Sequence, residues 1–194
     1  MSKTTETATG AVAATRAAVN SAAYNGFLIV SASLFVALCA RVTLPLPFTP
    51  VPLTLQNFGV LLVGIALGGW RGAAALALYV AEGASGLPVF NPAGPGGIAQ
   101  LLGPTGGFLM AYPAVAFIVG YISRCFERRF LPTLIGATLG EVVLFAGGIS
   151  WLMITVHASA AQAAQMAAVP FIFAEVIKIL GAAAIAPRLP KRFF

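Results

Sequence analysis

Six long stretches of this sequence are almost free of charged residues, and that pattern constrains the fold more than any other feature. They cover residues 22–44, 54–69, 73–86, 107–123, 134–156 and 169–186. Only 8% of all residues are charged and the mean hydropathy is +0.95, whereas a soluble domain carries about 25% charged residues. About 20 apolar residues cross a bilayer as a helix. The sequence therefore predicts an all-α integral membrane protein, with six transmembrane helices in a single membrane domain over residues 22–194.

The distribution of basic residues predicts the orientation in the membrane. Six spans place both termini on the same side of the membrane. Nine of the eleven basic residues, all except Arg41 and Lys178, lie on that side. The positive-inside rule then places both termini in the cytoplasm and the protein in the cell membrane. Residues 1–21 are polar and rich in alanine and threonine, so we expect a disordered cytoplasmic tail without a cleaved signal. Because the basic residues form no patch, we expect membrane lipid as a partner and no nucleic acid.

Two segments between the apolar runs should be irregular and face outward. Residues 44–52 contain four prolines, which exclude a helix and favour a stiff, extended loop that we expect to act as a lid. Residues 87–107 are rich in glycine and proline, so they do not form one regular helix. Irregular backbone at membrane depth is tolerated where it lines a cavity, which predicts one wall of a binding site. A plain surface loop is the alternative interpretation.

Three charged residues fall inside the predicted spans away from the span ends, where Arg41 and Glu82 lie: Glu141, Glu175 and Lys178. A charge at the centre of a span costs about 2.5 to 3.5 kcal/mol, so each needs a function or a partner. Glu175 and Lys178 are three residues apart and therefore share one helix face. They are interpreted either as ligand-recognition residues or as a structural ion pair. Two acids and one base leave one carboxylate unmatched, so Glu141 is either protonated or near a helix end.

The sequence offers little for catalysis or metal binding. Its five acidic residues are all glutamate, its single histidine, His157, lies at the end of a span, and no nucleotide-binding glycine loop is present. Cys39 and Cys125 have no neighbours at metal-ligand spacing, so we expect neither a metal site nor a disulfide. We predict a protein that is not an enzyme and has no cofactor. If it is a transporter, its energy comes from a gradient or from another polypeptide.

Several segments resemble the BioY family, the biotin-binding S components of energy-coupling factor (ECF) transporters. The matching segments are FTPVPLTLQNFGVLLVG (48–64), GLPVF (86–90), LLGPTGG (101–107) and PFIFAEVIK (170–178). The resemblance implies a six-helix membrane protein that captures biotin from outside. It also implies a transmembrane coupling protein and ATPase subunits as partners, or self-association if the protein acts alone. The small residues Ser33, Ala37 and Ala32 in the first span are the candidates for packing against the coupling protein.

The chemistry of biotin suggests which residues form its site. The ureido ring has two N–H donors and one carbonyl, the rings and chain are apolar, and the tail is a carboxylate. Glu175 and the Asn91 amide suit the ureido group, and Gln56 and Thr54 place polar groups at the top of the second span. Phe90, Phe48 and Trp151 are candidate apolar walls. The tail carboxylate has three candidate partners: the backbone of the turn that contains Gly106, Arg41, and Lys178.

Two other functions fit the same sequence features. An S component for a different vitamin would share the fold and partners. A non-catalytic membrane scaffold or interaction subunit is favoured if Glu175 and Lys178 only pair with each other.

Overall fold

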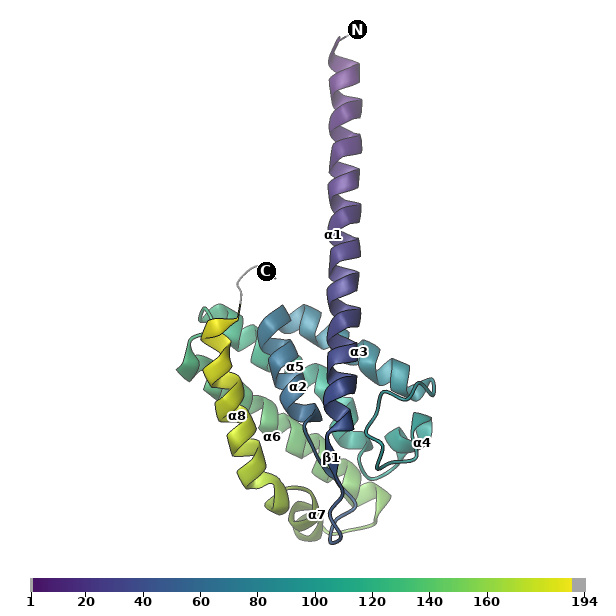
Figure 1. Ribbon diagram of the computed structural model, residues 1–194, viewed down its shortest axis with the longest axis vertical. Helices are drawn as coiled ribbons and strands as arrows, with labels where there is room; N and C mark the ends of the chain where they lie inside the picture. The colour runs from purple at the N-terminus through teal and green to yellow at the C-terminus, as the bar shows by residue number, and fades with distance from the viewer. Residues whose placement is uncertain (1, 190–194) are drawn as a thin grey trace.

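The computed structural model describes residues 2–189, with side chains from residue 21 onward, and almost all of this chain is helical (Figure 1). In chain order the elements are α1 (Ser2–Arg41), β1 (Thr43–Leu44), β2 (Leu53–Thr54), α2 (Gln56–Leu67), α3 (Gly69–Ala84), α4 (Gly97–Leu102), α5 (Gly106–Cys125), α6 (Phe130–Thr155), α7 (Ala160–Ala167), the 3-10 turn η1 (Val169–Phe171), α8 (Ile172–Ile185) and the 3-10 turn η2 (Ala186–Arg188).

Within residues 2–189, four helical segments are long and apolar enough to cross a membrane. They are Ser21–Arg41, Gly106–Cys125, Phe130–Thr155 and Ala160–Arg188. A multi-pass membrane protein is therefore confirmed, whereas the count of six spans stays a prediction. The reason is the length of α2 and α3, which have 12 and 16 residues, short of the roughly 20 that a bilayer requires.

Helix α1 includes residues 2–21, the segment for which the composition predicts a disordered tail, and the disorder stays a prediction. Its backbone is helical from Ser2, and this part projects well beyond the other helices in Figure 1. Alanine has the highest helix propensity of all residues, so the alanine-rich segment can extend the helix of the first span. The cytoplasmic placement of this tail stays a prediction.

Helix α5 is the central helix of the bundle and contacts α2, α3 and α6. Glycine makes this close packing possible: a Cβ atom at Gly64 would lie 2.6 Å from the backbone oxygen of Ala116, and one at Gly120 would lie 2.4 Å from the oxygen of Gly64. In lipid, helices associate through such close contacts because burial of apolar surface adds little. The small residues of α2 and α5 therefore fix the frame around which the other helices pack.

One end of the bundle is held together by Arg128, in the turn between α5 and α6. Only 3% of its surface is exposed. Its guanidinium donates to the carbonyl of Ala66 at 2.9 Å and to that of Leu189 at 3.0 Å. Carbonyls at helix ends lack partners within their helix, so one arginine joins the ends of α2 and of the last helical segment.

The opposite end carries the Pro-rich hairpin. Strands β1 and β2 pair antiparallel, with Thr43 opposite Thr54, and residues 45–52 connect them without forming a helix. The Thr49 hydroxyl donates to the Met166 carbonyl of α7 at 2.7 Å. Helix α7 itself was not predicted, although a capping box between Ser159 and Gln162 marks its start. The hairpin thus lies against the connection between α6 and α8.

Candidate ligand-binding site

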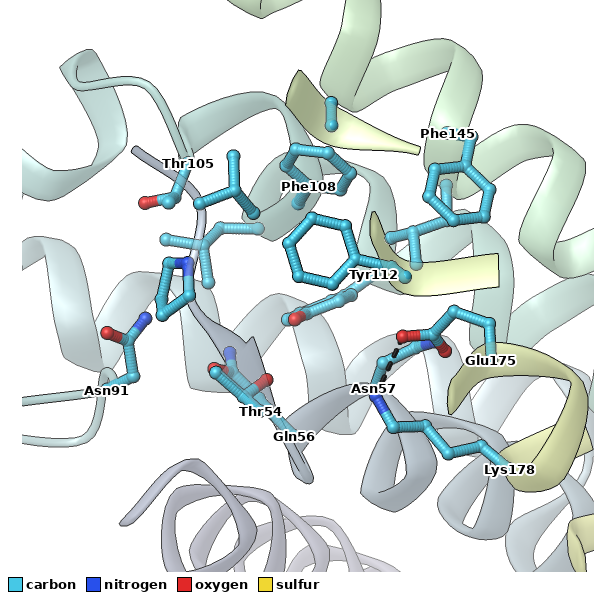
Figure 2. Close-up of a pocket in the computed structure, with 16 residues that line it drawn as sticks. Thr54, Gln56, Asn57, Asn91, Thr105, Phe108, Tyr112, Phe145, Glu175 and Lys178 are labelled. Atoms are coloured by element: carbon cyan, nitrogen blue, oxygen red, sulfur yellow. Dashed lines mark hydrogen bonds and ion pairs between the residues drawn. The ribbon is translucent and has the colours of Figure 1, made fainter. Parts of the chain in front are cut away.

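A cavity of about 530 Å³ lies between the hairpin and the helices (Figure 2). The side chains that line it come from the hairpin, α2, the Gly/Pro-rich segment, α5, α6, α7, η1 and α8: Val51, Pro52, Thr54, Gln56, Asn57, Asn91, Thr105, Phe108, Leu109, Tyr112, Leu144, Phe145, Ala167, Phe171, Glu175 and Lys178.

The charged groups of the cavity form one buried cluster. Lys178 Nζ lies 2.7 Å from Glu175 Oε1, and both side chains are nearly buried. The Asn57 Nδ2 amide donates to Glu175 Oε2 at 2.7 Å and also donates to Glu141 Oε1. Figure 2 shows Asn57, Glu175 and Lys178 gathered at one side of the cavity. Helices α2, α6 and α8 therefore meet through polar side chains at this point.

Aromatic rings form much of the remaining wall. Phe108 and Tyr112 are four residues apart on α5 and so share one helix face. Phe145 of α6 packs edge-on against Phe108, with ring centroids 6.5 Å apart, and Phe171 closes the side near α8. An apolar ring system would bury its surface against these side chains.

The Gly/Pro-rich segment is positioned by a relay of hydrogen bonds. Gln56 Nε2 donates to the Tyr79 hydroxyl at 2.9 Å, and that hydroxyl donates to the Val89 carbonyl at 2.9 Å. This relay holds the backbone just before Asn91, which lies on the opposite side of the cavity from Glu175 in Figure 2. Asn91 Oδ1 accepts a bond from the backbone N–H of Ala93 at 3.2 Å, so the amide is oriented locally.

A second cavity of about 780 Å³ lies beside the first. It is lined by the Pro-rich hairpin and the Gly/Pro-rich segment and shares Pro52, Asn91 and Thr105 with the first cavity. The two irregular segments that the sequence singled out therefore border one opening. This arrangement suits an entrance to the enclosed site.

Of the ten residues predicted to bind substrate, five line the first cavity: Glu175, Lys178, Asn91, Gln56 and Thr54. The structure does not bring the other five to it: Phe90, Phe48, Trp151, Arg41 and Gly106.

Phe90 and Trp151 instead hold the Gly/Pro-rich segment in place. The Phe90 ring is 3% exposed and packs edge-on against Tyr79, with centroids 5.5 Å apart. Trp151 Nε1 donates to the Gly103 carbonyl at 2.9 Å. Gly106 lies under this indole, where an added Cβ would be 2.9 Å from Trp151 Nε1. These two aromatic side chains were predicted as apolar walls of the site, and neither of them lines the cavity.

Phe48 and Arg41 lie toward solvent or lipid. Phe48 is 65% exposed on the hairpin, and Arg41 is exposed at the end of α1. The small residues predicted to face a coupling protein point elsewhere as well. Ser33 and Ala32 are buried against the chain's own helices, where the Ser33 hydroxyl donates to Glu82 on α3, and Ala37 is half-buried. They permit close packing within this chain.

Asn57, Tyr112 and Phe108 line the cavity but were missing from the predicted site. A signal for Asn57 existed in the sequence, because an amide among the first residues of an apolar span needs a polar partner. Tyr112 and Phe108 gave no such signal, since aromatic residues at helical spacing are also typical of an ordinary core.

The fold and the cavity define a class: a multi-helix membrane protein with a ligand-sized site between its helices. The BioY family model matches residues 9–194, and the chain belongs to this family. The resemblance seen in the sequence motifs is thereby confirmed.

Named relatives cover most of the chain. A biotin transporter BioY from Thermotoga maritima is 38% identical over 164 residues, 84% of this chain and 95% of that protein. A biotin transporter BioY from Rhizobium etli is 36% identical over 179 residues, 83% of this chain and 93% of that protein. The crystal structure of the S-component for biotin from an ECF-type ABC transporter superimposes with a TM-score of 0.78 at 25% identity, covering 87% of this chain and 92% of that one.

Proposed function

We propose that this protein captures biotin and takes it up across the cytoplasmic membrane, as the substrate-specific S component of an ECF transporter. The observation that carries the proposal is the enclosed cavity, whose aromatic walls lie between a buried carboxylate–ammonium pair on one side and the Asn91 amide on the other. Relatives named as biotin transporters and the fold of a biotin S-component support it.

The cavity matches each part of biotin. Glu175 is an acceptor for ureido N–H groups, and the Asn91 amide provides a donor for the ureido carbonyl. Phe108, Tyr112 and Phe145 suit the apolar rings and chain. Lys178 Nζ pairs with Glu175 at 2.7 Å, and a carboxylate acceptor forms a strong charge-assisted hydrogen bond with a ligand N–H group. This set of hydrogen-bond donors and acceptors supports binding and release of a ligand rather than catalysis.

The distribution of charge supports six spans with both termini in the cytoplasm. Among the described residues, Arg128 joins the ends of α2 and the last helical segment, and Arg71, Arg124, Arg129 and Arg188 lie in the turns and ends on that side. Arg41 lies at the hairpin end. The positive-inside rule then assigns the hairpin and both cavities to the outer face, where biotin arrives. Exposed Trp70 and Tyr121 near the basic end suit a membrane interface in contact with lipid.

The partners follow from the class of transporter. We propose that a transmembrane coupling protein and ATPase subunits drive uptake, in line with the ECF-type transporter from which the similar structure comes. Self-association is the alternative if the chain transports alone. Uptake measured in cells with and without a coupling module separates the two.

Binding of radiolabelled biotin to the purified full-length protein tests the proposal. We expect saturable binding that unlabelled biotin displaces and that thiamine or riboflavin leaves unchanged. A folded protein that binds one of the other vitamins, or none of them, would contradict the assignment to biotin.

A further inference from the structure

Glu141 lies beside the ligand cavity without lining it, and its charge is unmatched. It is 4% exposed, and its Oε1 accepts a bond from Asn57 Nδ2, the same nitrogen that donates to Glu175. Lys178 is engaged by Glu175 at 2.7 Å. The groups that face Glu141 are thus Asn57 on α2, Tyr112 on α5, and Glu175 and Lys178 on α8.

The number of charges in the cluster of Glu141, Glu175 and Lys178 favours one protonation state. If both glutamates were ionised, two carboxylates would bind one amide nitrogen and a single ammonium would leave a buried net charge of −1. Like charges in low dielectric repel strongly, and a charge within a span is costly unless it is paired. If Glu141 carries a proton, the cluster is neutral and keeps both bonds from Asn57.

Two buried atoms support the same state. Among the residues that the structure describes, Asn57 Oδ1 and Glu141 Oε2 are buried and have no hydrogen-bond partner. Both are acceptors when Glu141 is ionised, so neither can satisfy the other. One proton on Glu141 turns its unpartnered oxygen into a donor, whereas a buried polar atom left without a partner destabilises the fold.

We infer that Glu141 is a positioning residue held as a neutral carboxylic acid, which fixes the Asn57 amide so that its Nδ2 donates to Glu175, the carboxylate that lines the cavity. It acts through Asn57 and does not touch the ligand itself. When alkaline pH removes the proton, the new carboxylate repels Glu175 and competes for Asn57, so ligand affinity falls as the pH rises. The part of this inference that concerns affinity rests on the proposed binding of biotin.

Glutamine at this position is the matched control, because its amide offers one acceptor and a donor group, as the neutral acid does. Infrared spectra of the full-length protein in lipid, recorded at neutral pH with no ligand present, should show the carbonyl band of a protonated carboxylic acid. That band should be lost in Glu141→Gln and remain in Glu82→Gln, whose side chain bonds Ser33 away from the cavity. A spectrum without a band that depends on Glu141 would overturn the inference.

Biotin affinity across the pH range supplies the second readout. We expect Glu141→Gln to bind within about threefold of the natural protein at neutral pH, because one hydrogen bond of ordinary strength replaces another. Its affinity should fall less at alkaline pH than that of the natural protein. Glu141→Leu should bind at least about tenfold more weakly. Identical pH profiles for the natural protein and Glu141→Gln would refute the positioning role. If no variant binds biotin, the proposed function fails, while the infrared band still decides the state of Glu141.

Discussion

Replacing Glu175 with alanine should abolish high-affinity biotin binding and also weaken the fold. The carboxylate bonds Lys178 through Oε1 and Asn57 through Oε2, each at 2.7 Å, and about 90% of its side chain is buried. Removing one partner of a buried ion pair costs about 3 to 5 kcal/mol of stability. Loss of charge-assisted hydrogen bonds to the ligand, plus a donor left unpaired, should weaken binding by about 2 to 4 kcal/mol, roughly 30- to 700-fold.

The double variant Glu175→Ala, Lys178→Ala separates recognition from stability. Removing the lysine eliminates the unpaired ammonium, so the thermal unfolding temperature of the purified double variant should return most of the way to that of the natural chain. If Glu175 recognises the ureido N–H groups, radiolabelled biotin should still fail to bind. Lys178→Ala alone serves as the matched control, since it keeps the carboxylate and its bond from Asn57.

One result would refute this reasoning. A double variant that regains both stability and near-native biotin affinity would show that Glu175 and Lys178 form only a structural ion pair. The ureido site would then have to lie elsewhere in the cavity, with Asn91 as the next candidate.

Three further predictions concern topology, the hairpin and the Gly/Pro-rich segment. Reporter fusions at both termini should give cytoplasmic signals and a fusion within 87–107 an external one; an external terminus would contradict six spans. In a background without native cysteines, Phe48→Cys on the exposed hairpin should be labelled by an impermeant thiol reagent, and biotin should protect it; equal labelling would argue against a lid. Gly83→Ala should lower both thermal stability and biotin affinity, because the new Cβ would lie 2.1 Å from the Phe90 ring, whereas Gly26→Ala, with open space around it, should change neither.

Local features of the chain predicted much of the site. Hydropathy identified a membrane protein because a bilayer excludes charge over any 20-residue run. The pairing of Glu175 with Lys178 followed from the helical period, which brings residues three apart onto one face. The high cost of charge inside a span then marked them as functional or paired.

Other parts of the site required the tertiary structure. Asn57 meets Glu141 and Glu175 across sequence separations of 84 and 118 residues, which no local pattern reports. Phe90 was expected to form an apolar wall of the site, yet its ring packs over Gly83 and does not line the cavity. Helical spacing showed that Ser33 and Ala37 share a face, but not that this face meets α2 and α3 of the same chain. The sequence determines which side chains lie together on one helix, because the helical period is local. Which helix faces meet depends on the packing of all the helices at once. That packing decides which residues line the cavity.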